Sequence, residues 1–215
     1  MSKKIAVTLR HLTGENLFDR KLYIIKDYIE MLEKCGATVW PVLTENNIED
    51  AVTFCDGLLI PGSPHDTLPS YYGEEEMPGK TTYDVDEYHL DSLAVDAFLK
   101  AGKKVLGICA GIQEINVYYG GSLFQLIEGH SGGITHPVKV MKGSRIYDIY
   151  QEEEILVNSW HFQAVKRLGE GLKIAALAED GTVEAVENDQ ILAVQWHPEM
   201  MKDEKFFRYF LESML

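Results

Sequence analysis

Short apolar runs alternate with segments of helical periodicity along the first half of the chain. Runs typical of strands lie at 4–10, 37–42, 56–62 and 103–108. Apolar residues at helical spacing predict helices over 18–36, 84–102 and 110–121. Strands that alternate with helices in this way build a parallel sheet, because each helix carries the chain back along one face. This alternation restricts the chain to the α/β class.

The second half of the chain has a different pattern. Strand-like runs lie at 136–150, 153–161, 172–187 and 190–199, and the pattern at 203–215 predicts a terminal helix. The turn "EDGT", Glu179–Thr182, predicts a hairpin. We therefore expect one domain over residues 1–215. Its flavodoxin-like, mostly parallel central sheet has helices on both faces and a C-terminal antiparallel excursion. The loop from Pro61 to Tyr83 is unusually long, and such loops are commonly functional.

Charge and cysteine content narrow the possible partners and location. The 34 acidic and 20 basic residues give a net charge of −14 without a basic stripe, so we expect no nucleic-acid partner. No run of 18 apolar residues predicts a membrane span, and the first residues do not form a signal peptide, which favours a cytoplasmic protein. Three cysteines are too few for a disulfide framework, and Cys35 and Cys55 are interpreted as small apolar residues.

The segment "VLGICAGIQEIN", Val105–Asn116, has a cysteine between two glycines where a strand should end and a helix begin. Gly107 and Gly111 flank Cys109, and small residues at such a sharp turn avoid clashes around a projecting nucleophile. A thiol at a helix N-terminus faces the positive end of the helix dipole, which favours the thiolate. The N–H of Ala110 is placed to stabilise an oxyanion. Many ordinary strand–turn–helix junctions also carry glycines, so this pattern alone does not establish catalysis.

A partner for the thiol is expected in "AVQWHPE", Ala193–Glu199. His197 ends an apolar strand, and Pro198 biases it toward extended backbone. Glu199 follows two residues later, so its carboxylate can orient the imidazole. The alternative is a His-Pro turn with a solvated glutamate. Because the carboxyl ends of parallel strands meet at one edge of a sheet, His197 is expected near Cys109, which favours the catalytic interpretation.

The seven histidines do not predict a metal site. His65 lies in the long loop, His89 on a helix, and His130 and His136 flank "SGGIT". None is paired at i,i+4 spacing with an accompanying glutamate, and no cysteine pairs are present. We therefore expect no metal and no other cofactor.

"GICAGIQ" and "VQWHPE" together resemble the class I glutamine amidotransferase domains and, among them, the stand-alone γ-glutamyl hydrolases. "LLIPGSPHD" resembles the oxyanion strand and turn of the family, and "LPSYYGE" its P-x-x-Y-G-E segment. "YYGGSLFQ", "VNSWHFQ" and "DGTVEAVE" are similar to later blocks in the same order, so the resemblance covers nearly the whole chain. It is nearest to the γ-glutamyl-γ-aminobutyrate hydrolases, which implies a role in polyamine (putrescine) catabolism.

The resemblance implies hydrolysis of a γ-glutamyl amide bond through a γ-glutamyl thioester, with release of glutamate. Cys109 would be the nucleophile, His197 the general base and acid, and Glu199 the orienting carboxylate. Gly62 and Ala110 would supply the N–H groups of the oxyanion hole.

The resemblance also assigns the substrate-binding residues. Gln113, Ser159 and Trp160 would hold the α-amino and α-carboxylate end of the γ-glutamyl group. His161 matches a histidine of the family, and is either a substrate-binding residue or a structural hydrogen-bonding group at a strand end.

One position departs from the hydrolase pattern, in which arginine usually follows the nucleophile as G-x-C-R-G. This chain has Ala110 there. The N–H is retained, so the change puts substrate preference in doubt more than the chemistry. The amine leaving group and the oligomeric state stay open, although the family favours a homodimer.

Two other functions stay open for the chain. The main alternative to a hydrolase of a small γ-glutamyl substrate is a glutaminase subunit that delivers ammonia to a separate synthase partner. A non-catalytic relative that uses the pocket for sensing is a third possibility.

Overall fold

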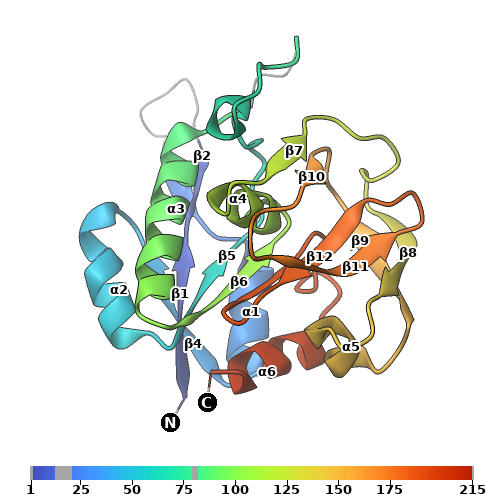
Figure 1. The fold of residues 1–215 in the computed structure, drawn as a ribbon. Coiled ribbons are helices and arrows are strands. Elements are labelled where there is room, and N and C mark those ends of the chain that lie inside the picture. The colour runs from blue at the N-terminus through green and yellow to red at the C-terminus, as the bar shows by residue number, and fades with distance from the viewer. Residues whose placement is uncertain (1, 13–20, 79–81, 215) are drawn as a thin grey trace.

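A nine-stranded mixed sheet forms the centre of the protein in the computed structural model, which describes residues 2–12, 21–78 and 82–214 (Figure 1). Its parallel half contains β4 Ala37–Val42, β1 Lys3–Thr8, β5 Gly57–Ile60, β6 Lys104–Ile108 and β13 Ile191–Val194, in that order. Its antiparallel half continues with β12 Val183–Glu187, β11 Lys173–Ala178, β8 Ile134–Val140 and β9 Glu154–Ser159. The predicted α/β fold with an antiparallel C-terminal extension is confirmed.

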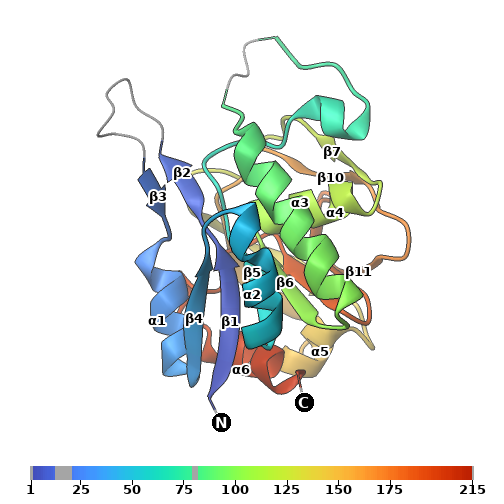
Figure 2. The same ribbon diagram turned by 90° about the vertical axis from the view of Figure 1, so that its left-hand side faces the viewer.

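Two small antiparallel sheets flank the main one (Figure 2). One pairs β2 Arg10–Leu12 with β3 Lys21–Tyr23, and the other pairs β7 Ser122–Phe124 with β10 Ala164–Arg167. The long loop after β5 contains a short 3₁₀ helix, Pro69–Tyr72. This loop is fastened to the β7–β10 side, because the N–H of Thr67 donates to Gln163 Oε1 at 2.7 Å.

Helices cover both faces of the main sheet. One face carries α1 Lys26–Lys34, α5 Arg145–Tyr150 and α6 Glu204–Glu212, and the other carries α2 Ile48–Phe54, α3 Val85–Lys100 and α4 Ala110–Tyr118. The helices bury apolar stripes against the strands, as Phe206, Phe207 and Phe210 of α6 do. Removal of these side chains from water is the main stabilising contribution of this layer.

The structure corrects two predicted elements. The helix expected over 18–36 begins only at Lys26, since 21–23 form β3; 18–20 lie outside the described residues. Its buried side is Tyr28, Met31 and Leu32, whereas Leu22 lies on β3 and is 45% exposed. The strand-like run 136–150 splits into β8 and helix α5, because Ser144 Oγ accepts the N–H of Tyr147 and caps a helical turn.

The helix α2 lies between two predicted strands and was not anticipated, because its seven residues are too few for a clear periodic pattern. Within the described ranges, no helix is long and apolar enough to cross a membrane.

Candidate active site

Cys109 occupies the turn between β6 and α4. As the N-cap of α4 it has φ 54° and ψ −104°, a conformation that costs a non-glycine residue backbone strain. Its N–H donates to the carbonyl of Val194 at 2.9 Å, which fastens the turn to the end of β13. The side chain is 6% exposed. The thiol thus stands at the N-terminus of a helix and at the carboxyl edge of the sheet.

The glycines around Cys109 allow close packing of α4 on the sheet. A Cβ on Gly111 would collide with the carbonyl oxygen of Ile60 on β5. A Cβ on Gly107 would lie 2.6 Å from Cδ1 of Ile115 and 2.8 Å from the carbonyl carbon of Gly111. Neither glycine has a positive φ, so space between elements, and not backbone freedom, is what these two positions require.

His197 and Glu199 lie next to this turn. β13 pairs with β6 in parallel, with Val194 opposite Ile108, so the chain leaves both strands at the same edge. His197 Nδ1 is 2.6 Å from Glu199 Oε1, and both side chains are buried. This contact orients the ring and leaves Nε2 for proton transfer.

The thiol and the imidazole also influence each other. Burial acts to lower the pKa of His197. The charge of Cys109 and its hydrogen bond to His197 oppose this effect, and Glu199 adds a hydrogen bond and a charge of its own. Together these contacts raise the pKa of His197 to about 10. An imidazole that keeps its proton at neutral pH can pass it to a leaving group when the thiolate is consumed. Cys109, His197 and Glu199 therefore have the chemistry that a cysteine hydrolase requires.

Gly62, in the turn after β5, lies next to both Cys109 and His197. A Cβ there would lie 2.8 Å from Cε1 of His197 and 3.4 Å from Cβ of Cys109. Its N–H, however, donates to the hydroxyl of Tyr28 at 2.9 Å, and that hydroxyl lies 3.5 Å from His197 Nδ1. The N–H that the sequence assigns to an oxyanion hole thus already has a partner. Sequence analysis missed Tyr28, and its place on the buried side of α1 carries no sign of this contact.

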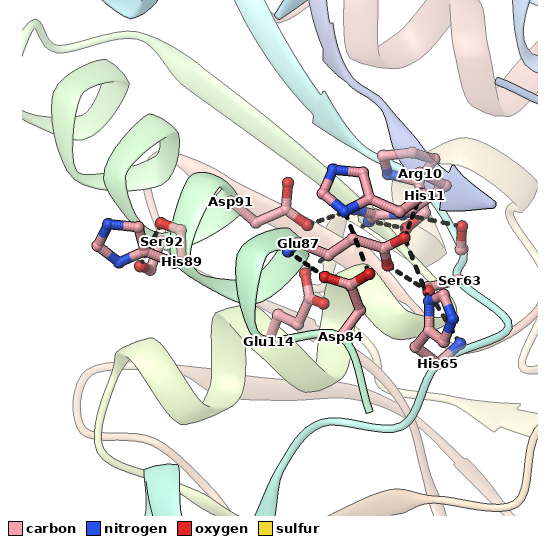
Figure 3. Close-up of polar contacts among 12 residues, drawn as sticks. Arg10, His11, Ser63, His65, Asp84, Glu87, His89, Asp91, Ser92 and Glu114 are labelled. Atoms are coloured by element: carbon pink, nitrogen blue, oxygen red, sulfur yellow. Dashed lines mark hydrogen bonds and ion pairs between the residues drawn. The ribbon is translucent and has the colours of Figure 1, made fainter. Parts of the chain in front are cut away.

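Arg10 on β2 holds the turn that contains Gly62. Its Nε donates to the carbonyl of Gly62 at 3.1 Å, its Nη2 donates to the carbonyl of Pro61, and its Nη1 pairs with Asp91 Oδ2 at 2.6 Å. The side chain is 2% exposed. Figure 3 shows Arg10 close to Asp91 on α3, with Glu114 of α4 below. Sequence analysis missed Arg10 as well, since one arginine at a strand end has no distinctive pattern.

Glu87 links the same turn to α3. Its Oε1 accepts from the N–H of His11 and lies 3.2 Å from His65 Nδ1, while its Oε2 accepts from Ser63 Oγ at 2.6 Å (Figure 3). His65, Asp84 and Glu87 lie close enough together to hold a metal ion. Each of these groups already has hydrogen bonds to the protein. These hydrogen bonds account for the cluster as structural support for the Gly62 turn.

The segment Asn158–His161 lies against the candidate site. Asn158 clamps the backbone of His197: its Oδ1 accepts the N–H of His197 at 2.8 Å, and its Nδ2 donates to the carbonyl of His197 at 3.1 Å. Ser159 is fully buried, and its Oγ donates to the carbonyl of His130 at 2.6 Å. Trp160 is 47% exposed and covers Gly133.

The remaining predicted substrate-binding residues make contacts within the protein. Gln113 on α4 donates to the carbonyl of Gln163 at 2.9 Å and lies 3.3 Å from Gln195 Oε1. His161 is buried, with Nδ1 2.9 Å from the carbonyl of Gln163 and Nε2 3.6 Å from Glu184. Ala110 is buried in the first turn of α4, where N–H groups have no helical partner.

Comparisons with known proteins agree with this arrangement. The family model of peptidase C26 matches residues 5–199. The glutamine amidotransferase-like protein YvdE of Lactococcus lactis is 35% identical over 201 residues, which are 86% of this chain and 84% of YvdE. The γ-glutamyl-γ-aminobutyrate hydrolase PuuD of Escherichia coli K12 is 30% identical over 182 residues, which are 73% of this chain and 69% of PuuD. The chain is thus more similar to an amidotransferase-like protein than to PuuD, so the predicted nearest likeness to γ-glutamyl-γ-aminobutyrate hydrolases is not confirmed.

Solved structures share the fold. A Thermoplasma acidophilum protein described as a GMP synthase component superposes with a TM-score of 0.71 at 21% identity, over 100% of this chain and 94% of that one. The glutaminase domain of Trypanosoma brucei CTP synthase gives a TM-score of 0.65 at 16% identity, over 99% of this chain and 94% of that one. By its sequence and its fold, the chain belongs to the peptidase C26 family of class I glutamine amidotransferase-like proteins.

Proposed function

We propose that this protein hydrolyses γ-glutamyl amide bonds, with Cys109 as nucleophile, His197 as general acid and base, and Glu199 as the orienting carboxylate. One observation carries the proposal: a thiol at a helix N-terminus converges with a carboxylate-backed imidazole at one edge of the sheet. Membership in a peptidase family supports hydrolysis, and the similarity to PuuD supports γ-glutamyl-γ-aminobutyrate as the substrate. Such a substrate would assign the protein to polyamine degradation.

In the first half of the proposed reaction, the Cys109 sulfur attacks the γ-carbonyl carbon and forms a tetrahedral intermediate. The N–H of Ala110, in the first turn of α4, stabilises the oxyanion. A second N–H, from Gly62, joins it once the oxyanion displaces the Tyr28 hydroxyl from this N–H. His197 gives its proton to the leaving amine, the C–N bond breaks, and a γ-glutamyl thioester remains on Cys109.

In the second half, water attacks the thioester carbon while His197 takes up one of its protons. The C–S bond then breaks, glutamate leaves, and the proton on His197 restores the starting pair. Glu199 keeps the ring in position throughout. No cofactor is needed for this sequence, because every proton and electron pair is supplied by the substrate, water and these side chains.

Substrate recognition is proposed to use Gln113, Ser159, Trp160 and His161. Ser159, Trp160 and His161 follow Asn158, which holds the backbone of His197, and Gln113 lies on α4, the helix that begins after Cys109. Ala110 stands where related hydrolases have a long cationic side chain, so we propose that the leaving group is held by other parts of the site.

The test is glutamate release by the purified protein alone, with γ-glutamyl-γ-aminobutyrate and with glutamine as separate substrates. We expect faster release from γ-glutamyl-γ-aminobutyrate, and loss of this release in Cys109→Ser. Cys35→Ser is the matched control: burial raises the pKa of Cys35, so this thiol is a poor nucleophile and the variant should stay active.

The alternative, a glutaminase subunit for a synthase partner, predicts a different result. Both substrates would then be nearly inert in the absence of the partner, although Cys109 would still react with an alkylating reagent. That result would contradict a free-standing hydrolase.

A further inference from the structure

Three histidines surround one buried glutamate in the antiparallel half of the molecule. Glu184 on β12 is fully buried. Its Oε1 lies 3.3 Å from His130 Nδ1, 3.6 Å from His136 Nε2 and 3.6 Å from His161 Nε2. His130 precedes β8 and His136 lies on it, so distant parts of the chain contribute to this cluster.

The atoms that face one another in this cluster lie at ion-pair distances of 3.3–3.6 Å, outside good hydrogen-bond geometry. Among the described residues, His130 Nδ1, His136 Nε2, His161 Nε2 and both carboxylate oxygens of Glu184 are buried without a hydrogen-bond partner. Buried polar groups are rarely left unsatisfied in folded proteins, because each costs free energy. An unsatisfied set of this composition that converges on one point calls for a cation between its members.

The outer contacts of the rings show which nitrogens carry lone pairs. His130 Nε2 lies 3.0 Å from Asp180 Oδ2, and His136 Nδ1 lies 3.2 Å from the carbonyl oxygen of Pro137. Both outer atoms can only accept, so in a neutral ring the proton lies on the outer nitrogen and the inner nitrogen is left free to bind a metal. This is how metal-ligating histidines are held, by an outer carboxylate or carbonyl.

The distances match a metal site. Zn²⁺ binds histidine nitrogen and carboxylate oxygen at about 2.0–2.1 Å, so two ligands of a tetrahedral ion lie roughly 3.3 Å apart. His130, His136 and Glu184 each offer one ligand atom, and these three atoms lie within 4.8 Å of one another. A cavity of about 150 Å³ is lined by His130, His136 and Asp180, so two of the histidines border on space open to solvent.

We propose that His130, His136 and Glu184 bind one divalent transition-metal ion of the zinc class, with Asp180 and His161 as supporting groups. Two histidines and a carboxylate are ligands that suit Zn²⁺ and similar ions better than Mg²⁺ or Ca²⁺. The ion joins the segment before β8, β8 itself and β12. Because Ser159 Oγ and the N–H of His161 both bond to the carbonyl of His130, it also braces the segment beside His197.

The test is Zn²⁺ binding by the full chain after chelator treatment and dialysis, followed by isothermal titration calorimetry. We expect one ion per chain with a dissociation constant in the micromolar range or below, and no comparable binding of Mg²⁺. Co²⁺ in place of Zn²⁺ should give d–d absorption bands typical of nitrogen and oxygen ligands. The Co²⁺ measurement uses the wild-type protein, so it does not depend on how any variant folds.

Variants identify the ligands. His136→Ala and Glu184→Gln should weaken Zn²⁺ binding by more than about 100-fold, and Asp180→Asn by about 10–100-fold, as is usual for an outer partner. His89→Ala is the matched control: His89 pairs with Glu45 on the surface, and its loss should leave binding unchanged. If the wild type binds neither ion, or if both ligand variants bind as tightly as it does, shared protons alone hold the cluster and the proposal is wrong.

Discussion

The hydroxyl of Tyr28 accepts the N–H of Gly62 at 2.9 Å and lies 3.5 Å from His197 Nδ1. One side chain of α1 therefore touches both the strand turn assigned to oxyanion stabilisation and the candidate base. In the proposed mechanism, the substrate oxyanion and this hydroxyl compete for one N–H. The resting enzyme has to give up this hydrogen bond before the Gly62 N–H can serve the reaction.

Tyr28→Phe should raise kcat/KM for the γ-glutamyl substrate by about fivefold, because a net hydrogen bond of about 1 kcal/mol no longer has to be broken. The variant should also be less stable, since the buried Gly62 N–H loses its partner. Steady-state kinetics and urea unfolding measure both effects. Tyr118→Phe, which removes a hydroxyl that donates to Asp96 on α3, is the control. A tenfold loss of kcat/KM in Tyr28→Phe would instead mean that the hydroxyl assists the reaction.

Glu199→Gln tests the orienting carboxylate. Glutamine has nearly the same shape but no charge, so His197 loses a group that stabilises its imidazolium and its ring orientation. We expect kcat to fall by about 10²–10⁴-fold with little change in KM, in the range known for the third member of such triads. A kcat within threefold of the wild-type value would show that the carboxylate of Glu199 is not needed for the reaction.

The raised pKa of His197 predicts a pH effect on stability. In the unfolded chain histidine titrates near 6.5, and in the folded protein His197 titrates at about 10. The stabilisation from its charged form is therefore complete below about pH 6.5 and is lost as pH rises toward 10. The unfolding free energy of the wild type should fall more steeply over this interval than that of His197→Ala. Parallel curves for the two proteins would contradict the assignment.

Gly111→Ala tests the close packing behind Cys109. Because the added Cβ collides with the carbonyl of Ile60, α4 has to move away from β5 and carry the cysteine turn with it. We expect the unfolding free energy to fall by about 1–3 kcal/mol, which is typical of overpacking. We also expect kcat to fall by a larger factor than the factor by which KM changes. Normal stability and normal kcat together would show that the turn at Cys109 accommodates the added methyl group, which would contradict the close packing described here.

Arg10→Met tests the support of the Gly62 turn. It removes two hydrogen bonds to the turn and leaves Asp91 buried without its cation. Breaking such a buried pair costs about 3–5 kcal/mol, so urea unfolding should detect it clearly. Arg208→Met removes a surface pair with Glu204 and should leave stability nearly unchanged. Equal effects of the two substitutions would contradict a supporting role of Arg10.

The sequence predicted the parts of the molecule that local patterns encode. Alternating strands and helices gave the α/β class, and the spacing around Cys109 gave the strand–turn–helix junction. It did not predict Tyr28, Arg10 or Asn158, because their contacts join segments that are far apart in the chain. The sequence did not predict the Glu184 cluster for the same reason. Its histidines have no metal-binding spacing in the sequence, and they meet Glu184 only because β8 and β12 belong to one sheet.

The most direct test of the account is the mass of the intact protein after acid quenching during turnover of γ-glutamyl-γ-aminobutyrate. We predict a species heavier by one γ-glutamyl group, located on Cys109 by peptide mapping and absent from Cys109→Ala. Cys55 serves as an internal control, because burial raises its pKa to about 11 and it should stay unmodified. Glutamate release without any adduct on Cys109, or at an undiminished rate in Cys109→Ala, would contradict covalent catalysis by this thiol.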